Sequence, residues 1–174
     1  MEKSLILYSS VDGHTKEICN RIASKARNTS VDIRSIDETD LRLNNYKKII
    51  VGASIRYGNY RKSLFNFIDK NKDILDSRDN AFFSVNVVAR KPEKNEPNTN
   101  PYMIKFLKKT DWKPKILKVF AGKIDYPKYR FFDKYAIRLI MWITNGPTDL
   151  SKSFEFTNWS KVESFSEELK IWTK

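Results

Sequence analysis

The chain has 174 residues, 40% hydrophobic and 31% charged, a composition typical of a folded globular protein and not of a disordered chain. Its single cysteine, Cys19, excludes an internal disulfide framework and is interpreted as a packing residue. The formal net charge is +12, and residues 90–134 hold 13 Lys and Arg against 5 Asp and Glu. Such a field favours anionic partners, or it is a solvated surface that only aids solubility.

Strand-like and helix-like patterns alternate along the chain, with short connections between them. Short apolar runs predict strands at residues 5–8, 31–33, 48–52, 81–85 and 116–121. Apolar residues at helical spacing predict helices at residues 18–26, 64–68, 102–109 and 159–172. The last helix begins with Asn158 or Ser160 as its cap and carries Trp172 on its apolar face. This order predicts an α/β fold: a doubly wound five-stranded parallel sheet with helices on both faces, in a single domain of residues 1–174.

The connection from about residue 122 to residue 150 is far longer than the usual few residues. It holds a helical pattern in which aromatic and apolar residues mix with Arg and Lys, and Asn-Gly-Pro at residues 145–147 ends that helix. One interpretation is an amphipathic helix packed on its own domain. The other is a helix that covers a ligand or lies on a membrane surface.

No apolar run approaches the roughly 20 residues that a transmembrane helix needs. The apolar run near the N-terminus is also too short for the core of a signal peptide. We therefore expect a cytoplasmic protein, and that location leaves binding to a membrane surface open.

The stretch LILYSSVDGHTKEI, residues 5–18, joins a buried strand to a helix through a turn rich in hydroxyls. Ser and Thr side chains, a glycine turn and the free N–H groups of a helix N-terminus together bind anions. The turn is neither a Walker loop nor G-x-G-x-x-G, so we expect it to hold a single phosphate group. The predicted phosphate-binding residues of this loop one are Ser9, Ser10, Asp12, Gly13, His14 and Thr15. We expect Asp12 and His14, the only histidine, to act through the backbone more than through their side chains.

Two further loops follow predicted strands and should lie beside loop one, because the carboxyl ends of parallel strands meet at one edge of a sheet. Loop two is GASIRYG, residues 52–58, and loop three is SVNVVARKPEK, residues 84–94. Small or apolar loops beside a phosphate turn can sandwich a planar ring, which favours flavin mononucleotide (FMN). The predicted ring-binding residues are Ala53, Ser54, Ile55, Arg56, Tyr57, Gly58, Ser84, Val85 and Asn86. Neither a metal-ligand cluster nor a catalytic triad pattern competes with this interpretation.

Several of these stretches resemble a known family. Loop one resembles the Ser/Thr-x-Thr-Gly-x-Thr phosphate loop of flavodoxins, with Asp12 in place of the usual threonine. The stretches GASIRYGNY, FFSVNVVARKPEKNEPNTNPY and AGKIDYPKYRFFDKYAIRLIM resemble the menaquinone-dependent protoporphyrinogen IX dehydrogenases of bacteria, flavodoxin-like enzymes of haem biosynthesis. The resemblance runs from Leu5 to about Trp159, and VARKPEK is its most specific part.

The resemblance implies a flavodoxin-like fold in which the long insertion splits the last strand, which resumes near residues 153–156. It implies non-covalent FMN, oxidation of protoporphyrinogen IX to protoporphyrin IX, and transfer of electrons to menaquinone or another quinone. The two propionates of that substrate need cations near the flavin edge, for which Arg56, Arg90 and Lys91 are the candidates. No further catalytic side chain is indicated. Because substrate and quinone both partition into membrane, we expect a peripheral position on the inner face of the cell membrane.

Three other functions are weighed against this one. A flavodoxin-like electron carrier shares the loops, but such carriers are typically acidic and this chain is at +12. An NAD(P)H:quinone reductase of the same fold is permitted by the loops, although its signature is not found. A nucleic-acid-binding module rests on charge alone, so we expect no nucleic acid partner. The oligomeric state is not indicated.

Overall fold

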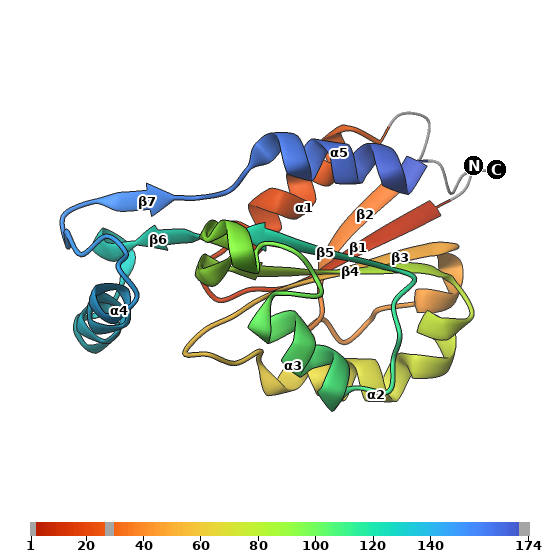
Figure 1. Cartoon of the computed structure of the whole chain (residues 1–174). Helices are drawn as coiled ribbons and strands as arrows, with labels where there is room; N and C mark the ends of the chain where they lie inside the picture. The colour runs from red at the N-terminus through yellow and green to blue at the C-terminus, as the bar shows by residue number, and fades with distance from the viewer. Residues whose placement is uncertain (1–2, 27–29, 171–174) are drawn as a thin grey trace.

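The centre of the molecule is a five-stranded parallel sheet (Figure 1). The computed structural model describes residues 3–26 and 30–170 of the chain. The strands are β1 (Lys3–Ser9), β2 (Ser30–Ser35), β3 (Lys48–Ser54), β4 (Asp79–Asn86) and β5 (Ile116–Ala121). Their order in the sheet is β2-β1-β3-β4-β5, so the chain reverses its direction of winding between β1 and β3. That reversal is the switch point beside which doubly wound folds bind ligands.

Helices cover both faces of this sheet (Figure 1). Helices α1 (His14–Ser24) and α5 (Trp159–Lys170) lie on one face, and α2 (Lys62–Asp76) and α3 (Pro101–Lys109) lie on the other. Successive side chains of a strand point to opposite faces, so each buried strand supplies both layers. On β4, the Phe82 ring stacks on Phe106 with centroids 3.9 Å apart, while Phe83 meets Phe165 at 6.1 Å on the opposite side. The predicted doubly wound architecture is confirmed.

Two helix starts follow the cap chemistry of their sequences. The Asn100 side chain accepts hydrogen bonds from two backbone N–H groups in the first turn of α3. The Asn158 side chain accepts from the N–H of Lys161 at 3.0 Å, so Asn158, and not Ser160, caps α5. Trp172, predicted on the apolar face of this helix, lies outside the described residues.

The α4 segment, which we define as residues 122–156, leaves the main sheet at the end of β5 (Figure 1). It contains β6 (Lys123–Asp125), α4 (Phe131–Ile143) and β7 (Ser153–Glu155). Strands β6 and β7 form a separate antiparallel pair, with Ile124 opposite Phe154. A strand therefore resumes near residues 153–156, as expected, but it pairs with β6 and does not rejoin the main sheet. The chain has reversed direction by β7, so this strand pairs antiparallel with β6 and adds no parallel strand.

A small core of its own holds the α4 segment together. Ile124, Tyr126 and Met141 are buried there, and the Tyr126 hydroxyl donates to the carbonyl of Pro147 at 2.8 Å. Helix α4 ends as predicted. Asn145 adopts a left-handed φ of 55°, and the next N–H, that of Gly146, bonds to the Met141 carbonyl at 2.7 Å.

Short 3-10 turns complete the described chain, at Leu43–Asn45, Val87–Arg90, Pro92–Lys94 and Tyr126–Lys128. Among the helices of residues 3–26 and 30–170, none combines the length and apolarity needed to cross a bilayer.

Candidate functional site

The three loops meet at the carboxyl edge of the sheet, beside the switch point. Loop one follows β1, loop two follows β3 and loop three follows β4. The N–H of Ile55 in loop two donates to the Val85 carbonyl at 3.0 Å, which joins two of these loops directly. The cleft between the loops is lined by Ser10, Val11, Asp12, His14, Thr15, Ser54, Ile55, Arg56, Val85, Asn86, Val87, Gly122 and Lys123.

Loop one has the form of an anion-binding turn. Gly13 has a φ of 86°, which glycine adopts without strain, and its N–H donates to the Ser10 hydroxyl oxygen at 3.0 Å. Helix α1 begins at the next residue, so its first N–H groups have no partner within the helix. The hydroxyls of Ser9 and Thr15 are buried and also lack a hydrogen-bond partner. Buried polar groups are nearly always bonded, and Thr15 also lines the cleft, so its hydroxyl is in place to donate to a bound ligand.

The His14 ring fastens loop one to a distant part of the chain. Nδ1 lies 3.0 Å from a carboxylate oxygen of Glu17, and Nε2 lies 2.7 Å from the hydroxyl oxygen of Thr157. That hydroxyl donates to the Ala121 carbonyl at 2.8 Å, so its oxygen accepts from His14. The ring is buried and its edge meets Trp159. The side chain of His14 thus has a structural role, which the sequence did not indicate.

Loop two makes a tight reversal at the mouth of the cleft. Arg56 and Asn59 exchange backbone hydrogen bonds of 3.0 and 3.1 Å, and the two residues between them have left-handed φ values of 49° at Tyr57 and 73° at Gly58. A positive φ is natural for glycine but uncommon for a bulky residue such as tyrosine. Non-glycine residues held in this region cluster at ligand sites and switches.

The guanidinium of Arg56 connects three segments. Nη1 donates to Asp12 of loop one at 2.6 Å, and Nη2 donates to Asp133 in the first turn of α4 at 2.8 Å. The Tyr57 hydroxyl donates to the other oxygen of Asp133. This hydrogen bond and the Arg56 charge lower the pKa of Asp133. Burial alone would lower the pKa of Arg56, but Asp12 outweighs it and the net shift is upward. We call Arg56, Tyr57, Asp12 and Asp133 the Arg56 node.

Loop three is held by an amide network. Asn86 accepts from the N–H of Ala89 at 3.1 Å and from the Asn100 amide at 3.1 Å. Ser84, predicted to bind the flavin ring, instead accepts from the Tyr60 hydroxyl at 2.7 Å and is fully buried behind the loop. Asn86 itself remains on the cleft wall.

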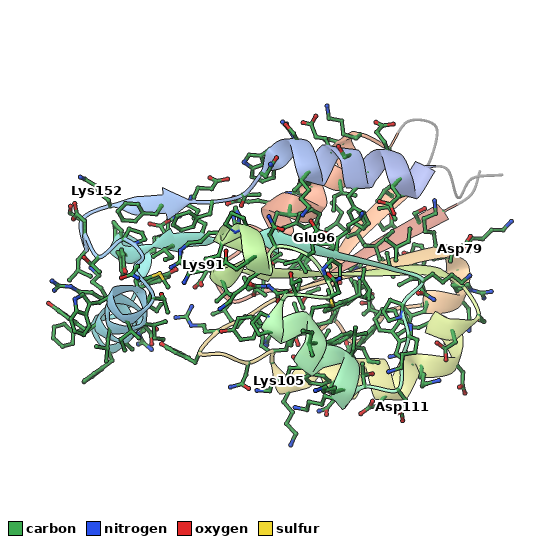
Figure 2. All side chains as sticks on the ribbon, viewed as in Figure 1. Asp79, Lys91, Glu96, Lys105, Asp111 and Lys152 are labelled. Carbon is green, nitrogen blue, oxygen red and sulfur yellow. The ribbon has the colours of Figure 1, made fainter. Side chains whose placement is uncertain are left out.

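The other two cations predicted for the substrate lie outside the lining of the cleft. Arg90 donates through Nη2 to the carbonyl of Thr144, just after α4, at 2.9 Å, and through Nη1 to Val87 at 3.2 Å. Burial lowers the pKa of Arg90. Lys91 lies at the junction of the body with the α4 segment, while Lys152 lies at the far end of that segment (Figure 2). Of the three predicted cations, Arg56 alone lines the cleft.

Helix α4 closes a second chamber that continues from the cleft. Ile137, Ile140 and Met141 share one face of α4 and line this chamber together with Arg56 and Gly58. The remaining wall residues are Asp12, Ile55, Tyr57, Asn86, Val87, Val88, Tyr102, Lys123, Ile124 and Tyr129. The sequence interpretation missed the residues from α4, and also Tyr102, Tyr129 and Lys123. The position of Lys123 directly after β5, a fourth strand end, was the signal that could have identified it.

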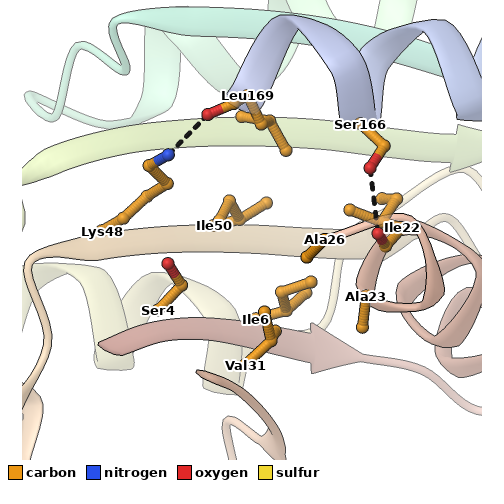
Figure 3. A pocket seen from close by; sticks show the side chains of 10 residues that line it. All are labelled: Ser4, Ile6, Ile22, Ala23, Ala26, Val31, Lys48, Ile50, Ser166 and Leu169. Carbon is orange, nitrogen blue, oxygen red and sulfur yellow. Dashed lines mark hydrogen bonds between the residues drawn. The ribbon is translucent and has the colours of Figure 1, made fainter. Parts of the chain in front are cut away.

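Two features of the interior away from the cleft are explained by packing and hydrogen bonding alone. An apolar cavity of about 40 Å³ lies between α1, α5 and the sheet (Figure 3), and a space of that size holds at most a few water molecules. Its Lys48 and Ser166 side chains donate to backbone carbonyls, as the dashed lines of Figure 3 show. Cys19 is fully buried and its burial raises the pKa of the thiol, which agrees with a packing role.

The residues of the cleft fit a flavin nucleotide. The unpartnered Thr15 hydroxyl and the start of α1 supply donors for a phosphate. Ile55, Val85 and Val87 supply apolar edges from loops two and three. The Arg56 charge neutralises Asp12, the one carboxylate of loop one, which removes the repulsion that Asp12 would exert on an anion.

The comparisons with known proteins agree with this geometry. A family model described as a flavodoxin domain matches residues 5–151. Among solved structures, the oxidised flavodoxin 1 of Bacillus cereus superposes with a TM-score of 0.55 over 96% of both chains at 16% identity. A Streptococcus pneumonia TIGR4 flavodoxin superposes with a TM-score of 0.52 over 97% of this chain and 98% of its own, at 15% identity. At these identities the likeness establishes the fold.

Sequence relatives are much closer. The protoporphyrinogen IX dehydrogenase [quinone] of Escherichia coli (strain K12) is 41% identical over 96% of this chain and 94% of its own length. A protein of the same name from Leishmania major is 42% identical over 94% of this chain and 73% of its own length. The chain therefore belongs to the protoporphyrinogen IX dehydrogenase [quinone] family, a family of flavodoxin-like oxidoreductases.

Proposed function

We propose that this chain binds FMN, oxidises protoporphyrinogen IX to protoporphyrin IX in haem biosynthesis, and passes the electrons to menaquinone or another quinone. The observation that carries the proposal is the pair of unpartnered, buried hydroxyls of loop one, Ser9 at the end of β1 and Thr15 in the first turn of α1, in a chain of this family. The names of the relatives give the substrate and acceptor class of those proteins, and the proposal extends them to this chain.

In this proposal, loop one holds the phosphate through the hydroxyls of Ser9 and Thr15 and the first N–H groups of α1. Loops two and three hold the flavin ring between apolar side chains, among them Ile55 and Val85. When bound, the flavin supplies the two-electron chemistry, accepting hydride at its N5 atom. The chain contributes position and electrostatics, and the wall formed by α4 keeps water from the reacting centre.

Arg56 is the cation that we propose for a propionate of the substrate, because it lines both the cleft and the second chamber. A propionate bound there shares the guanidinium with Asp12 and Asp133, which each occupy one of its two Nη atoms. Arg90, with its Nη atoms directed to backbone carbonyls, is not retained for this role. Lys91 is not retained either, because it lines neither the cleft nor the second chamber.

We further propose that the protein works as a peripheral protein on the inner face of the cell membrane. The outward face of α4 carries Phe132, Leu139 and Trp142, which are 85%, 56% and 69% exposed, with Lys134 and Arg138 on the same helix. An apolar helix face flanked by cations fits an anionic lipid surface. Such a position brings the second chamber close to the membrane that dissolves both substrate and quinone.

An anaerobic reduction experiment tests the enzymatic proposal. Purified protein loaded with FMN is mixed with protoporphyrinogen IX or, separately, with NADH, and the flavin absorbance is followed. We expect protoporphyrinogen to bleach the flavin and a menaquinone analogue to restore its colour. Rapid bleaching by NADH and none by protoporphyrinogen would replace the proposal with an NAD(P)H:quinone reductase. Bleaching by neither would favour an electron carrier.

A further inference from the structure

Two arginines, one from each of the loops proposed to hold the flavin ring, hold the two ends of α4. Arg56 of loop two bonds to Asp133 in the first turn of the helix, and Arg90 of loop three bonds to the Thr144 carbonyl just after its last turn. The Arg90 guanidinium also lies close to Gly146, where an added Cβ would meet Nη2 at 3.0 Å. Helix α4 is thus attached to the flavin-binding edge of the sheet at both ends.

The charges of these attachments match the polarity of a helix. The first turn of a helix favours a carboxylate and its last carbonyls favour a cation. Asp133 supplies the carboxylate in the first turn, and Arg90 supplies the cation at the other end. Both arginines are partly buried, and the Arg56 side chain is only 18% exposed, so these pairs are less screened by water than pairs on an open surface.

Between the two attachments lies the wall of the second chamber. Asp133, Ile137, Ile140 and Met141 fall at i, i+4, i+7 and i+8, so they share one helix face. The apolar members of this set line the chamber, and Asp133 bonds to two other residues of its wall, Arg56 and Tyr57. Apolar packing of the helix itself is small: in the described chain Met141 is the only buried residue of α4, and Ile137 packs partly buried against the same small core.

We propose that Asp133 and Arg90 are positioning residues for the substrate: they hold α4 at the distance from loops two and three that shapes the chamber for the tetrapyrrole. This inference rests on the proposed function. It also gives Arg90 a role different from direct contact with a propionate. Neither residue needs to touch the substrate, since each acts by fixing the helix that does.

The experiment measures substrate binding and helix order separately in the FMN-loaded full chain. Asp133→Asn removes one attachment, Arg90→Met removes the other while keeping the apolar stem, and Asp133→Glu restores the carboxylate. Asp149→Asn is the matched control, because Asp149 lies in the same segment and its side chain, within the described residues, bonds to the nearby Ser151 and Lys152 and not to loops two and three. For each variant we measure kcat, KM for protoporphyrinogen, the Kd of FMN by flavin fluorescence, and amide hydrogen exchange across α4.

We expect Asp133→Asn and Arg90→Met each to raise KM about tenfold, because each removes one charged hydrogen bond. The values of kcat and of the Kd for FMN should stay within about twofold of the original. Exchange should rise in α4 and not in α1. In Asp133→Glu, the KM should return most of the way to its original value. Unchanged KM and exchange in both variants would overturn the inference. A parallel loss of FMN affinity and thermal midpoint would do so too, because it would assign these residues to general stability. If the unaltered protein failed to oxidise protoporphyrinogen, the proposed function would fall instead. The hydrogen-exchange data would still show whether Asp133 and Arg90 hold α4 in place.

Discussion

Helix α2 and helix α4 are both amphipathic, yet they use their apolar residues in different ways. Helix α2 buries Leu64, Phe65, Ile68 and Leu75 against the sheet, and its large apolar residues are all covered or partly covered. In the described chain, the exposed large hydrophobic side chains are Phe131, Phe132, Tyr135, Leu139, Ile140, Trp142 and Ile143 on α4, and Val11 and Tyr57 on loops one and two. Apolar exposure is therefore concentrated around the mouth of the proposed site.

The difference shows that the body of the molecule buries its large apolar side chains, while α4 presents an apolar surface outward. Figure 2 shows side chains spreading from α4 on the side away from the sheet. Isolated surface hydrophobics are ordinary, but a contiguous patch marks an interaction surface. Substitutions in the body should accordingly change stability, and those on the outer face of α4 should change binding.

The largest effect is expected in the aromatic core. Phe106→Ala removes a fully buried ring that stacks on Phe82, and should lower the free energy of unfolding by about 3–5 kcal/mol. Phe132→Ala, at 85% exposure, should change it by less than about 0.5 kcal/mol. Urea unfolding followed by circular dichroism measures both. Similar losses in the two variants would show that α4 is as essential to stability as the body.

The next effect concerns the unpartnered hydroxyls. Thr15→Val keeps the shape of the side chain but removes a donor that we assign to the phosphate, so the Kd of FMN should rise about tenfold or more. Ser63→Ala is the control, because Ser63 carries another buried hydroxyl without a partner, on α2 and away from the cleft. Fluorescence titration with FMN compares them. Equal affinities in both variants would remove Thr15 from the phosphate site.

The outer face of α4 should govern binding to lipid. Replacing Phe132 and Trp142 by serine should reduce flotation with anionic vesicles by about tenfold or more, since each buried aromatic contributes roughly 1.5–3 kcal/mol. Raising the salt concentration should weaken the binding of the original protein as well.

The control is the thermal midpoint, which should stay the same in this double variant. A failure of the original protein to float with anionic vesicles at low salt would contradict the membrane proposal directly.

The smallest effect is a dependence on pH at the Arg56 node. The Tyr57 hydroxyl and the Arg56 charge hold the pKa of Asp133 below its ordinary 3.8, so the carboxylate is harder to protonate in the folded chain than in the unfolded one. Its stabilising contribution is therefore complete above about pH 4 and is lost as the pH falls through the lowered folded value. Pepsin cleavage within α4 should accelerate over that range, and less so in Asp133→Asn, which has no carboxylate to titrate. Identical pH profiles would exclude the node as the cause.

The sequence predicts those parts of the molecule that depend on local pattern. Short apolar runs locate the five strands, Asn-Gly-Pro ends α4, and the strand order brings the three loops together. Partners distant in sequence were not predictable. Arg56 is 44 residues from Asp12 and 77 from Asp133, and no pattern around it reveals that two carboxylates approach it. The pairing of β6 with β7 was missed for a related reason, because three-residue strands carry too little periodicity to identify.

The link from His14 to Thr157 has a consequence for how the protein is made. Loop one is synthesised well before one of its supports, because its histidine bonds to a residue 143 positions further along the chain. Helix α5, which packs on α1, is also made long after it. A nascent chain on the ribosome therefore carries the phosphate turn long before that turn has its full support. Capture of the flavin should accordingly wait until Thr157 and α5 have been made, and a fragment that stops before Thr157 should capture it poorly.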